Sequence, residues 1–171
     1  MQPDFVIRVD PPRVERDQWI VLEDASTELP DGAIIVPLAA WNARRDELIV
    51  RNTPVGIWLN PEDAPEGLAR DLPALNLVAV QFPKSADGRG YSTAVVLRRL
   101  GYRGELRAFG DIGRDHLLAL RRCGFDAFVL PPGRDPERAL AAFAEFTVFY
   151  QGSVENPVPL FRRRAIPGGA A

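Results

Sequence analysis

The sequence predicts an α/β protein with an open parallel sheet and crossover helices in three layers, Rossmann-like or flavodoxin-like. Short apolar runs alternate with helical stretches at intervals of roughly 20–30 residues, as in parallel strands joined by helices. The runs are apolar almost throughout, which is typical of strands covered on both faces. Because there are too few units to close an eight-unit barrel, half of a βα-barrel that pairs with a second copy is the alternative.

Strands are expected at five apolar runs. They are AIIV (33–36), VGIWL (55–59), LVAVQF (77–82), ELRAF (105–109) and AFVL (127–130). The last four are expected to be parallel neighbours or near-neighbours in one sheet. Before them, residues 1–32 read as an irregular leader with one short strand at WIVLED (19–24).

A helix is expected after each strand. Pro37 suits the start of the first helix, because its fixed φ is tolerated there. The second, through DAPEGLARDL, is weaker. The third begins at Ser92, a good N-cap, and stops at Gly101. The fourth runs from Asp111 to Gly124, and the fifth from Asp135–Pro136 through ERALAAFAEFTVFY.

Residues 1–150 are therefore expected to form one domain, and residues 151–171 an exposed tail rich in proline and arginine. In the fifth helix, Phe143, Phe146, Phe149 and Tyr150 form an aromatic stripe, either core or interface. In the tail, FRRR (161–164) is either a solvated segment or a docking segment in which Phe161 anchors and the arginines meet an acidic partner.

Composition excludes several classes of function. The net charge is −2 and the pI about 5.5, so a wide basic surface for nucleic acid is not expected. With Cys123 as the only cysteine and His116 as the only histidine, no intrachain disulfide, iron–sulfur cluster, or His-rich zinc or haem site is expected, and no metal ligands are assigned. Neither a signal peptide nor a membrane-spanning run is seen, which predicts a cytoplasmic protein without a membrane partner.

Polar loops follow the strands at what would be the carboxyl rim of the sheet, where ligands usually bind. The side chains expected to converge there are Asn60, Lys84, Asp87, Arg89, Asp111 and Arg134. Lys84 and Arg89, with the flexible glycines and the helix start beside them, suit a small oxyanion or a carboxylate. Asp87 and Asp111 would orient these cations, or bind a hard metal together with a ligand. In the structural alternative, Asp87 is a turn residue and Asp111 a helix cap, or Arg89 pairs with Asp111 and ties two loops together. Nucleotide and hydrolase motifs are lacking, since GRGYST has Thr93 at the third glycine position.

The string DGRGYS…LRRLGYRGELRAFGDI…GFDAF resembles a bacterial family of unknown function, often labelled "probable oxidoreductase". Genes of that family tend to lie beside those for sulfite reductase and phosphoadenylylsulfate reductase. The resemblance implies an association with assimilatory sulfate reduction, with these two enzymes as possible partners. It supplies no catalytic residue and no cofactor, and it departs at His116, where the family often has Gln.

Two classes of function remain open. One is an accessory or binding protein of sulfite reduction with an anion or partner site on the rim. The other is an enzyme, possibly an oxidoreductase with a dissociable cofactor, on a small anionic substrate. The candidate site residues are Lys84, Asp87, Gly88, Arg89, Gly90, Tyr91, Ser92, Arg107, Gly110 and Asp111. No nucleophile–base pair can be read, which favours the binding protein.

Overall fold

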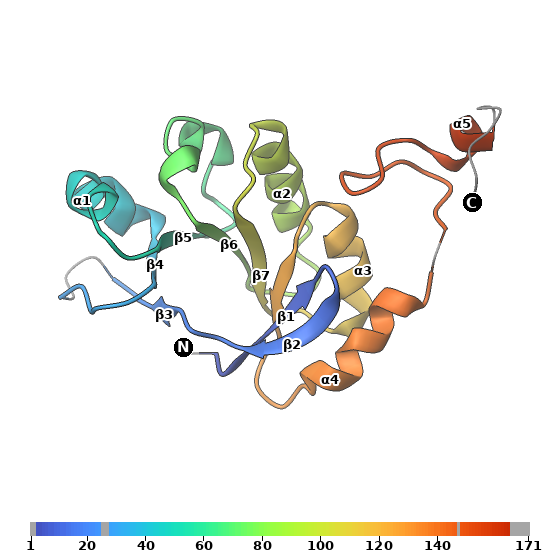
Figure 1. Cartoon of the computed structure of the whole chain (residues 1–171), viewed down its shortest axis with the longest axis horizontal. Coiled ribbons are helices and arrows are strands. Elements are labelled where there is room, and N and C mark those ends of the chain that lie inside the picture. Colours follow the sequence, from blue (N-terminus) through green and yellow to red (C-terminus); the bar gives the residue numbers. More distant parts are fainter. Residues whose placement is uncertain (1–2, 25–27, 147, 165–171) are drawn as a thin grey trace.

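The computed structural model describes residues 3–24, 28–146 and 148–164. An eight-stranded sheet runs through the molecule in the order β2-β1-β8-β7-β6-β5-β4-β3 (Figure 1). Six strands are parallel and follow one another in chain order: β3 (Ile20–Val21), β4 (Ile34–Pro37), β5 (Val55–Leu59), β6 (Leu77–Phe82), β7 (Glu105–Gly110) and β8 (Ala127–Val129). The expected parallel neighbours among β5 to β8 are therefore confirmed.

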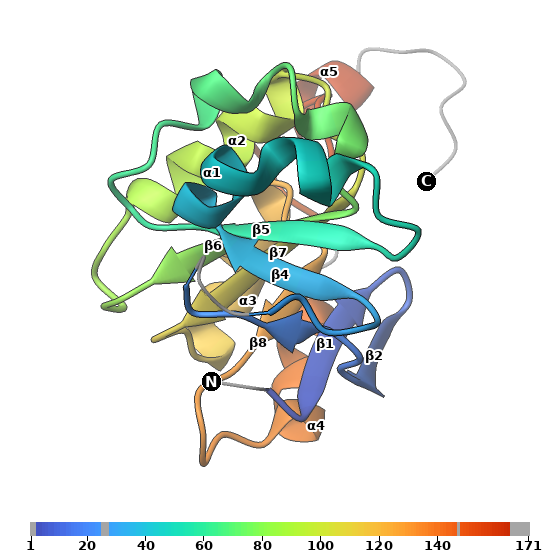
Figure 2. The ribbon, with the colours of Figure 1, turned by 90° about the vertical axis from the view of Figure 1, so that its left-hand side faces the viewer.

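The strand order decides between the two arrangements that the sequence left open. A doubly wound sheet reverses its strand order near the middle, and this reversal puts helices on both faces. Here the order of the parallel strands never reverses. The sheet curls, and α1, α2 and α3 lie along its convex side (Figures 1 and 2). The α/β class is confirmed, and the arrangement is the curled half-barrel rather than three layers.

Helices follow the strands, with some changes from the expected bounds. The α-helices are α1 (Leu38–Ile49), α2 (Arg89–Arg99), α3 (Arg114–Arg122), α4 (Pro136–Ala139) and α5 (Leu160–Arg164). The weak second helix consists of two 3₁₀ turns, η1 (Pro65–Leu68) and η2 (Leu72–Ala74), each with proline in its first turn. The α2 N-cap is Gly88, not Ser92, and the α3 N-cap is Gly113, not Asp111.

The N-terminal segment differs most from expectation. Residues read as an irregular leader form β1 (Phe5–Val9) and β2 (Pro12–Arg16), which pair antiparallel, and β1 pairs antiparallel with β8. Val6 and Val9 are buried, whereas Phe5 is exposed and Arg8 is partly exposed. The hairpin therefore extends the curled sheet past β8.

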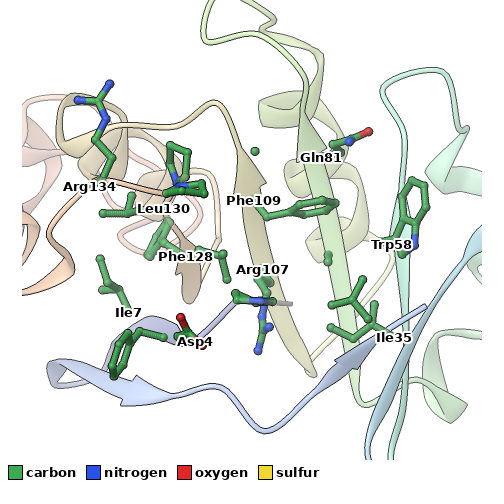
Figure 3. Close-up of a pocket in the computed structure, with 18 of the residues that line it drawn as sticks. Asp4, Ile7, Ile35, Trp58, Gln81, Arg107, Phe109, Phe128, Leu130 and Arg134 are labelled. Carbon is green, nitrogen blue, oxygen red and sulfur yellow. The ribbon is translucent and has the colours of Figure 1, made fainter. Parts of the chain in front are cut away.

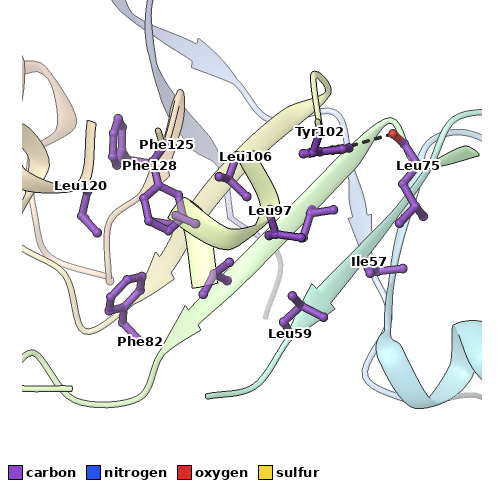
Figure 4. Close-up of a cluster of buried hydrophobic side chains, with 14 of the residues drawn as sticks. Ile57, Leu59, Leu75, Phe82, Leu97, Tyr102, Leu106, Leu120, Phe125 and Phe128 are labelled. Atoms are coloured by element: carbon purple, nitrogen blue, oxygen red, sulfur yellow. Dashed lines mark hydrogen bonds between the residues drawn. The ribbon is translucent and has the colours of Figure 1, made fainter. Parts of the chain in front are cut away.

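The main core lies between the convex face of the sheet and the helices. Apolar side chains from β5 to β8 meet Leu97 of α2 and Leu120 of α3 there (Figure 4). The buried polar tips find partners: Trp41 Nε1 donates to Asp71 at 3.2 Å, and the Tyr102 hydroxyl donates to the Leu75 carbonyl at 3.4 Å. Burial raises the pKa of the Tyr102 hydroxyl. This packing leaves the concave face free for another role.

The fifth expected helix is shorter than the sequence pattern suggests. After α4 the chain continues as the 3₁₀ helix η3 (Leu140–Ala144) and then leaves helical geometry. Of the aromatic stripe, Phe143 is buried against Phe128, while Phe146 and Tyr150 are exposed. The following segment projects from the α3 side of the domain and ends in α5 (Figure 1). The expected tail beyond Arg164 lies outside the described residues.

Candidate functional site

Alternate residues of the parallel strands point to the concave face of the sheet. On β7 these are Arg107 and Phe109, since Leu106 and Ala108 belong to the main core. Arg107 pairs in register with Ala79 of β6 and Ala127 of β8, so a large side chain stands between two small ones. Phe109 lies one step nearer the carboxyl rim.

A pocket of about 600 Å³ occupies this concave face and reaches the carboxyl ends of β6, β7 and β8. That volume lies within the range of small-molecule sites. Figure 3 shows Ile35, Trp58 and Gln81 on one side and Ile7, Phe128 and Leu130 on the other, with Arg107 and Phe109 between them. We call this site the concave pocket.

A buried ion pair forms the floor of the concave pocket. The Arg107 guanidinium donates to Asp17 at 2.6 and 3.2 Å and to Glu105 at 2.9 Å. The Arg107 and Asp17 side chains are 2% and 1% exposed. Because two carboxylates already occupy this guanidinium, Arg107 stiffens the floor and is not a free cation for an anion.

The ion pair continues into the N-terminal hairpin. Glu105 also accepts from Arg8 at 2.7 Å, and Arg8 donates to Glu15 at 2.6 Å. Hydrogen bonds from Arg13, the largest cause, and from Arg8 lower the pKa of the Glu15 carboxyl. The network joins β2, β1 and β7 at the deep end of the concave face. Arginines and carboxylates alternate along this network, so its charges largely balance.

The walls of the pocket are aromatic and fixed in place. Trp58 donates its indole N–H to the Leu22 carbonyl at 3.1 Å, so the ring orientation is set by the β3 end. Phe109 meets Trp58 edge to face, with ring centroids 6.4 Å apart. Such pre-organised rings offer a surface on which a planar ligand can stack at little entropic cost.

Polar side chains gather toward the mouth of the pocket. Gln81 is half-buried, and its amide has no hydrogen-bond partner among the described residues. Arg134 is exposed in the loop after β8, and the described part of the chain shows no ion pair for it. Asp4 and Glu23 also line the pocket. The site therefore combines apolar walls with a few polar groups, as ligand pockets do.

The predicted rim residues lie beside this pocket, mostly outside its lining. Only Arg107 and Gly110 of the ten line it. Lys84, the only lysine of the chain, is exposed. Arg89 pairs with Asp87 at 2.7 Å and with Glu62 at 3.0 Å, which raises the Arg89 pKa and lowers the Asp87 pKa. The tie that the sequence suggested between Arg89 and Asp111 is replaced by this pairing.

Asp111 and the glycines have structural partners at the rim. The Ser85 N–H donates to Asp111 at 2.9 Å and so joins the loops after β6 and β7. Gly110 has φ +108°, and a side chain there would meet the Phe82 carbonyl oxygen; at Gly90 it would meet the Phe82 ring. Tyr91 packs on the same ring, with centroids 5.6 Å apart. These glycines allow close packing around Phe82.

Three further positions of the predicted rim, Gly88, Ser92 and Asn60, lie at the start of α2 or in the loop after β5. Gly88 caps α2 and Ser92 is exposed on its first turn. The Asn60 backbone N–H donates to the Asp63 carboxylate at 2.7 Å. The anion site of Lys84 and Arg89 stays a prediction. Arg89 is paired with two carboxylates, whereas Lys84 forms no ion pair among the described residues.

The surroundings of Cys123 and His116 indicate structural roles for both side chains. Cys123 is half-buried against the main core, and burial raises the pKa of its thiol. His116 Nδ1 accepts from the Gly113 N–H at 3.0 Å and so satisfies the start of α3. Among the described residues, no three His, Cys, Asp or Glu side chains gather as a metal ion requires.

The sequence reasoning missed Trp58, Gln81, Phe109 and Asp17 as site residues. One signal was available: Arg107 is a charge inside an apolar strand, and such a residue needs a buried partner.

Within the described part of the chain, no helix has both the length and the apolar character to cross a membrane.

Comparison with known proteins gives one match. No curated protein and no solved structure matches the chain. The model of a family described as "Bacterial protein of unknown function (DUF934)" matches residues 56–161, which span β5 to the first turn of α5 and include Trp58, Gln81, Arg107 and Arg134. Since this match covers more than half of the chain, the protein belongs to that family of bacterial proteins of unknown function.

Proposed function

We propose that this chain is an accessory binding protein of assimilatory sulfite reduction that holds an organic anion in the concave pocket. The observation that carries the proposal is the pocket itself: about 600 Å³, apolar and aromatic in its depth, with Gln81 and Arg134 toward its mouth. An apolar ring would lie against Trp58 and Phe109, and an anionic group would meet Arg134.

The lining supports binding rather than covalent catalysis. Among the described residues that line the pocket there is no Ser, Thr, Tyr, Cys, His or Lys, the side chains that usually serve as nucleophile or proton shuttle. Asp17 and Glu105 are bonded to Arg107, so neither is placed as a free base. Asp4 and Glu23 remain as the carboxylates of the lining.

The link to sulfite reduction rests on the resemblance of the central string. Genes of the resembling family tend to lie beside those for sulfite reductase and phosphoadenylylsulfate reductase, so these enzymes are the candidate partners. The exposed rim carrying Lys84 and Arg89 is the proposed contact, beside the pocket mouth. A cytoplasmic location goes with this proposal.

A second candidate is an oxidoreductase with a dissociable cofactor. The observation that favours it is the pair of fixed rings, Trp58 and Phe109, which suit a flavin or nicotinamide ring. Redox chemistry would then belong to the cofactor, and the chain would bind and orient it.

Ligand titration tests both candidates. Trp58 fluorescence should change on addition of the right ligand, so the purified chain is titrated separately with flavin mononucleotide, NADPH, sulfite, sulfate and phosphate. Trp58→Phe should lose the signal, and Phe109→Ala should weaken binding by about tenfold or more. Phe161→Ala, a ring far along the chain in α5, serves as the control and should bind normally.

Growth of a deletion strain separates the classes. If the wild-type chain restores sulfite reduction and Phe109→Ala does not, the pocket is required. Saturable binding of flavin mononucleotide or NADPH would favour the enzyme. Restoration by Phe109→Ala at wild-type level would refute a role for the pocket in this function.

A further inference from the structure

The exposed apolar side chains of this protein are concentrated in one segment. Ten large apolar side chains are exposed in the described residues, and six lie between 146 and 161. They are Phe146, Val148, Tyr150, Val154, Val158 and Phe161, exposed by 38% to 69%. We call residues 146–164 the C-terminal arm; Thr147 within it is not described. Such a concentration marks an interaction surface.

The C-terminal arm has a defined shape of its own. The Leu160 N–H donates to the Tyr150 carbonyl at 3.1 Å, which closes residues 150–160 into a loop. Inside the loop, Ser153 and Asn156 bond to each other twice, and Arg163 donates to the Val158 carbonyl at 2.8 Å. Because the arm is already ordered, binding through it loses less conformational entropy.

One side of the arm is attached to the domain. The Arg122 guanidinium lies 4.5 Å from the Phe149 ring centroid, and Arg121 pairs with Glu155 at 2.6 Å. The Val154 N–H donates to the Arg122 carbonyl at 3.1 Å. These contacts fix the arm at the end of α3. The Tyr150 and Phe161 rings, 6.2 Å apart, remain exposed on it.

Charge separates the arm from the rest of the chain. Residues 1–145 carry 22 acidic and 18 basic side chains, net −4, whereas residues 146–171 carry one glutamate and three arginines, net +2. Within the described residues, Arg162 is exposed and forms no ion pair. A partner for the arm should therefore be acidic and offer apolar contact.

We propose that the C-terminal arm docks on the acidic domain of a second copy of this chain. The domain of residues 1–145 supplies the required charge. The arm also projects away from its own domain (Figure 1), so it is placed to reach another. If two copies exchange arms about a two-fold axis, each contact occurs twice and the assembly closes as a dimer. This inference does not depend on the proposed function.

Sedimentation velocity over a concentration series tests the proposal with the full chain. We expect a discrete dimer. Tyr150→Ala with Phe161→Ala should raise its Kd by about tenfold or more, because buried aromatic side chains dominate interfaces. Tyr150→Phe with Phe161→Tyr is the matched control, since it keeps both exposed rings, and it should leave the Kd nearly unchanged.

Charge reversal gives an independent measurement. Arg162→Glu with Arg163→Glu should raise the dimer Kd, and added salt should do the same to the wild type. Arg162→Lys with Arg163→Lys, which keeps the positive charge of the arm, is the control and should leave the Kd nearly unchanged. Circular dichroism confirms that each variant is folded. A wild-type chain that stays monomeric throughout the series, or a dimer unaffected by both arm variants, overturns the proposal. Binding of the arm to DNA or to anionic vesicles with the chain still monomeric also overturns it.

Discussion

At the scale of single residues, Arg107 is the side chain on which the floor of the concave pocket depends. Arg107→Met leaves Asp17 as a buried carboxylate without its cation and Glu105 with Arg8 alone, and we expect it to lower the free energy of unfolding by about 3–5 kcal/mol. Urea unfolding measures this. Arg107→Met combined with Asp17→Leu should recover much of the loss. A single variant as stable as wild type would contradict the assigned role.

The two roles considered for Arg89, a tie between loops and an anion site, predict different effects of Arg89→Ala. Its ion pairs with Asp87 and Glu62 are exposed, so Arg89→Ala should change the melting temperature little. If the rim binds anions, the acylation of Lys84, the only lysine, should be slower in the presence of sulfite, sulfate or phosphate. This protection should be weaker in Arg89→Ala than in the wild type. Arg138→Ala is the control. A sharp fall in melting temperature without any anion effect would make Arg89 a tie between loops.

Cys123 gives a residue-scale test of burial. Because burial raises the pKa of its thiol, little thiolate should be present at neutral pH, and alkylation should be slower than in the urea-unfolded chain. The rate should rise as the pH is raised above about 8.5, the ordinary thiol pKa. The single cysteine makes the mass change unambiguous. Equal rates in the folded and unfolded chain at neutral pH would show that the thiol is accessible and reactive.

At the scale of elements, Gly110 limits how β7 can end. It has φ +108°, and a methyl group there would meet the Phe82 carbonyl, whereas Gly133 has φ +84° with open space around it. Gly133→Ala should therefore cost only the conformational penalty, about 1 kcal/mol, and Gly110→Ala clearly more. Urea unfolding of both variants provides the comparison. Equal losses would mean that the rim adjusts to the added methyl group.

Elements also show what the sequence could predict. The strands at 55–59, 77–82, 105–109 and 127–130 were recognised because burial on both faces makes most of their residues apolar. The hairpin of β1 and β2 was missed because FVIRV is a short apolar run broken by Arg8, and because the prolines and arginines that follow it are typical of a loop. The α4–η3 break was missed because ERALAAFAEF keeps good helix formers beyond the last turn.

At the scale of the whole molecule, the site was harder to predict than the fold. Arg107 and Gly110 were named from the sequence, but Trp58 and Gln81 join Phe109 because β5, β6 and β7 are adjacent and Gln81 stands opposite Phe109, and because the sheet curls around this face. Strand order depends on the sum of all helix–sheet contacts, which local periodicity does not report. The same curling turns one sheet face into a pocket.

The N-terminal segment covers the β8 edge of the half-barrel sheet and supplies a partner for its buried arginine. Residues 1–18 supply β1, β2 and Asp17, which cover the β8 edge and pair with the buried Arg107. Their removal should expose a strand edge and an unpaired buried cation together. We expect the shortened chain to aggregate or to lose its near-UV circular dichroism while it keeps helical signal. Removal of residues 165–171, which keeps every described contact, is the control. A shortened chain that unfolds cooperatively at the wild-type melting temperature would show that β3 to β8 are stable alone.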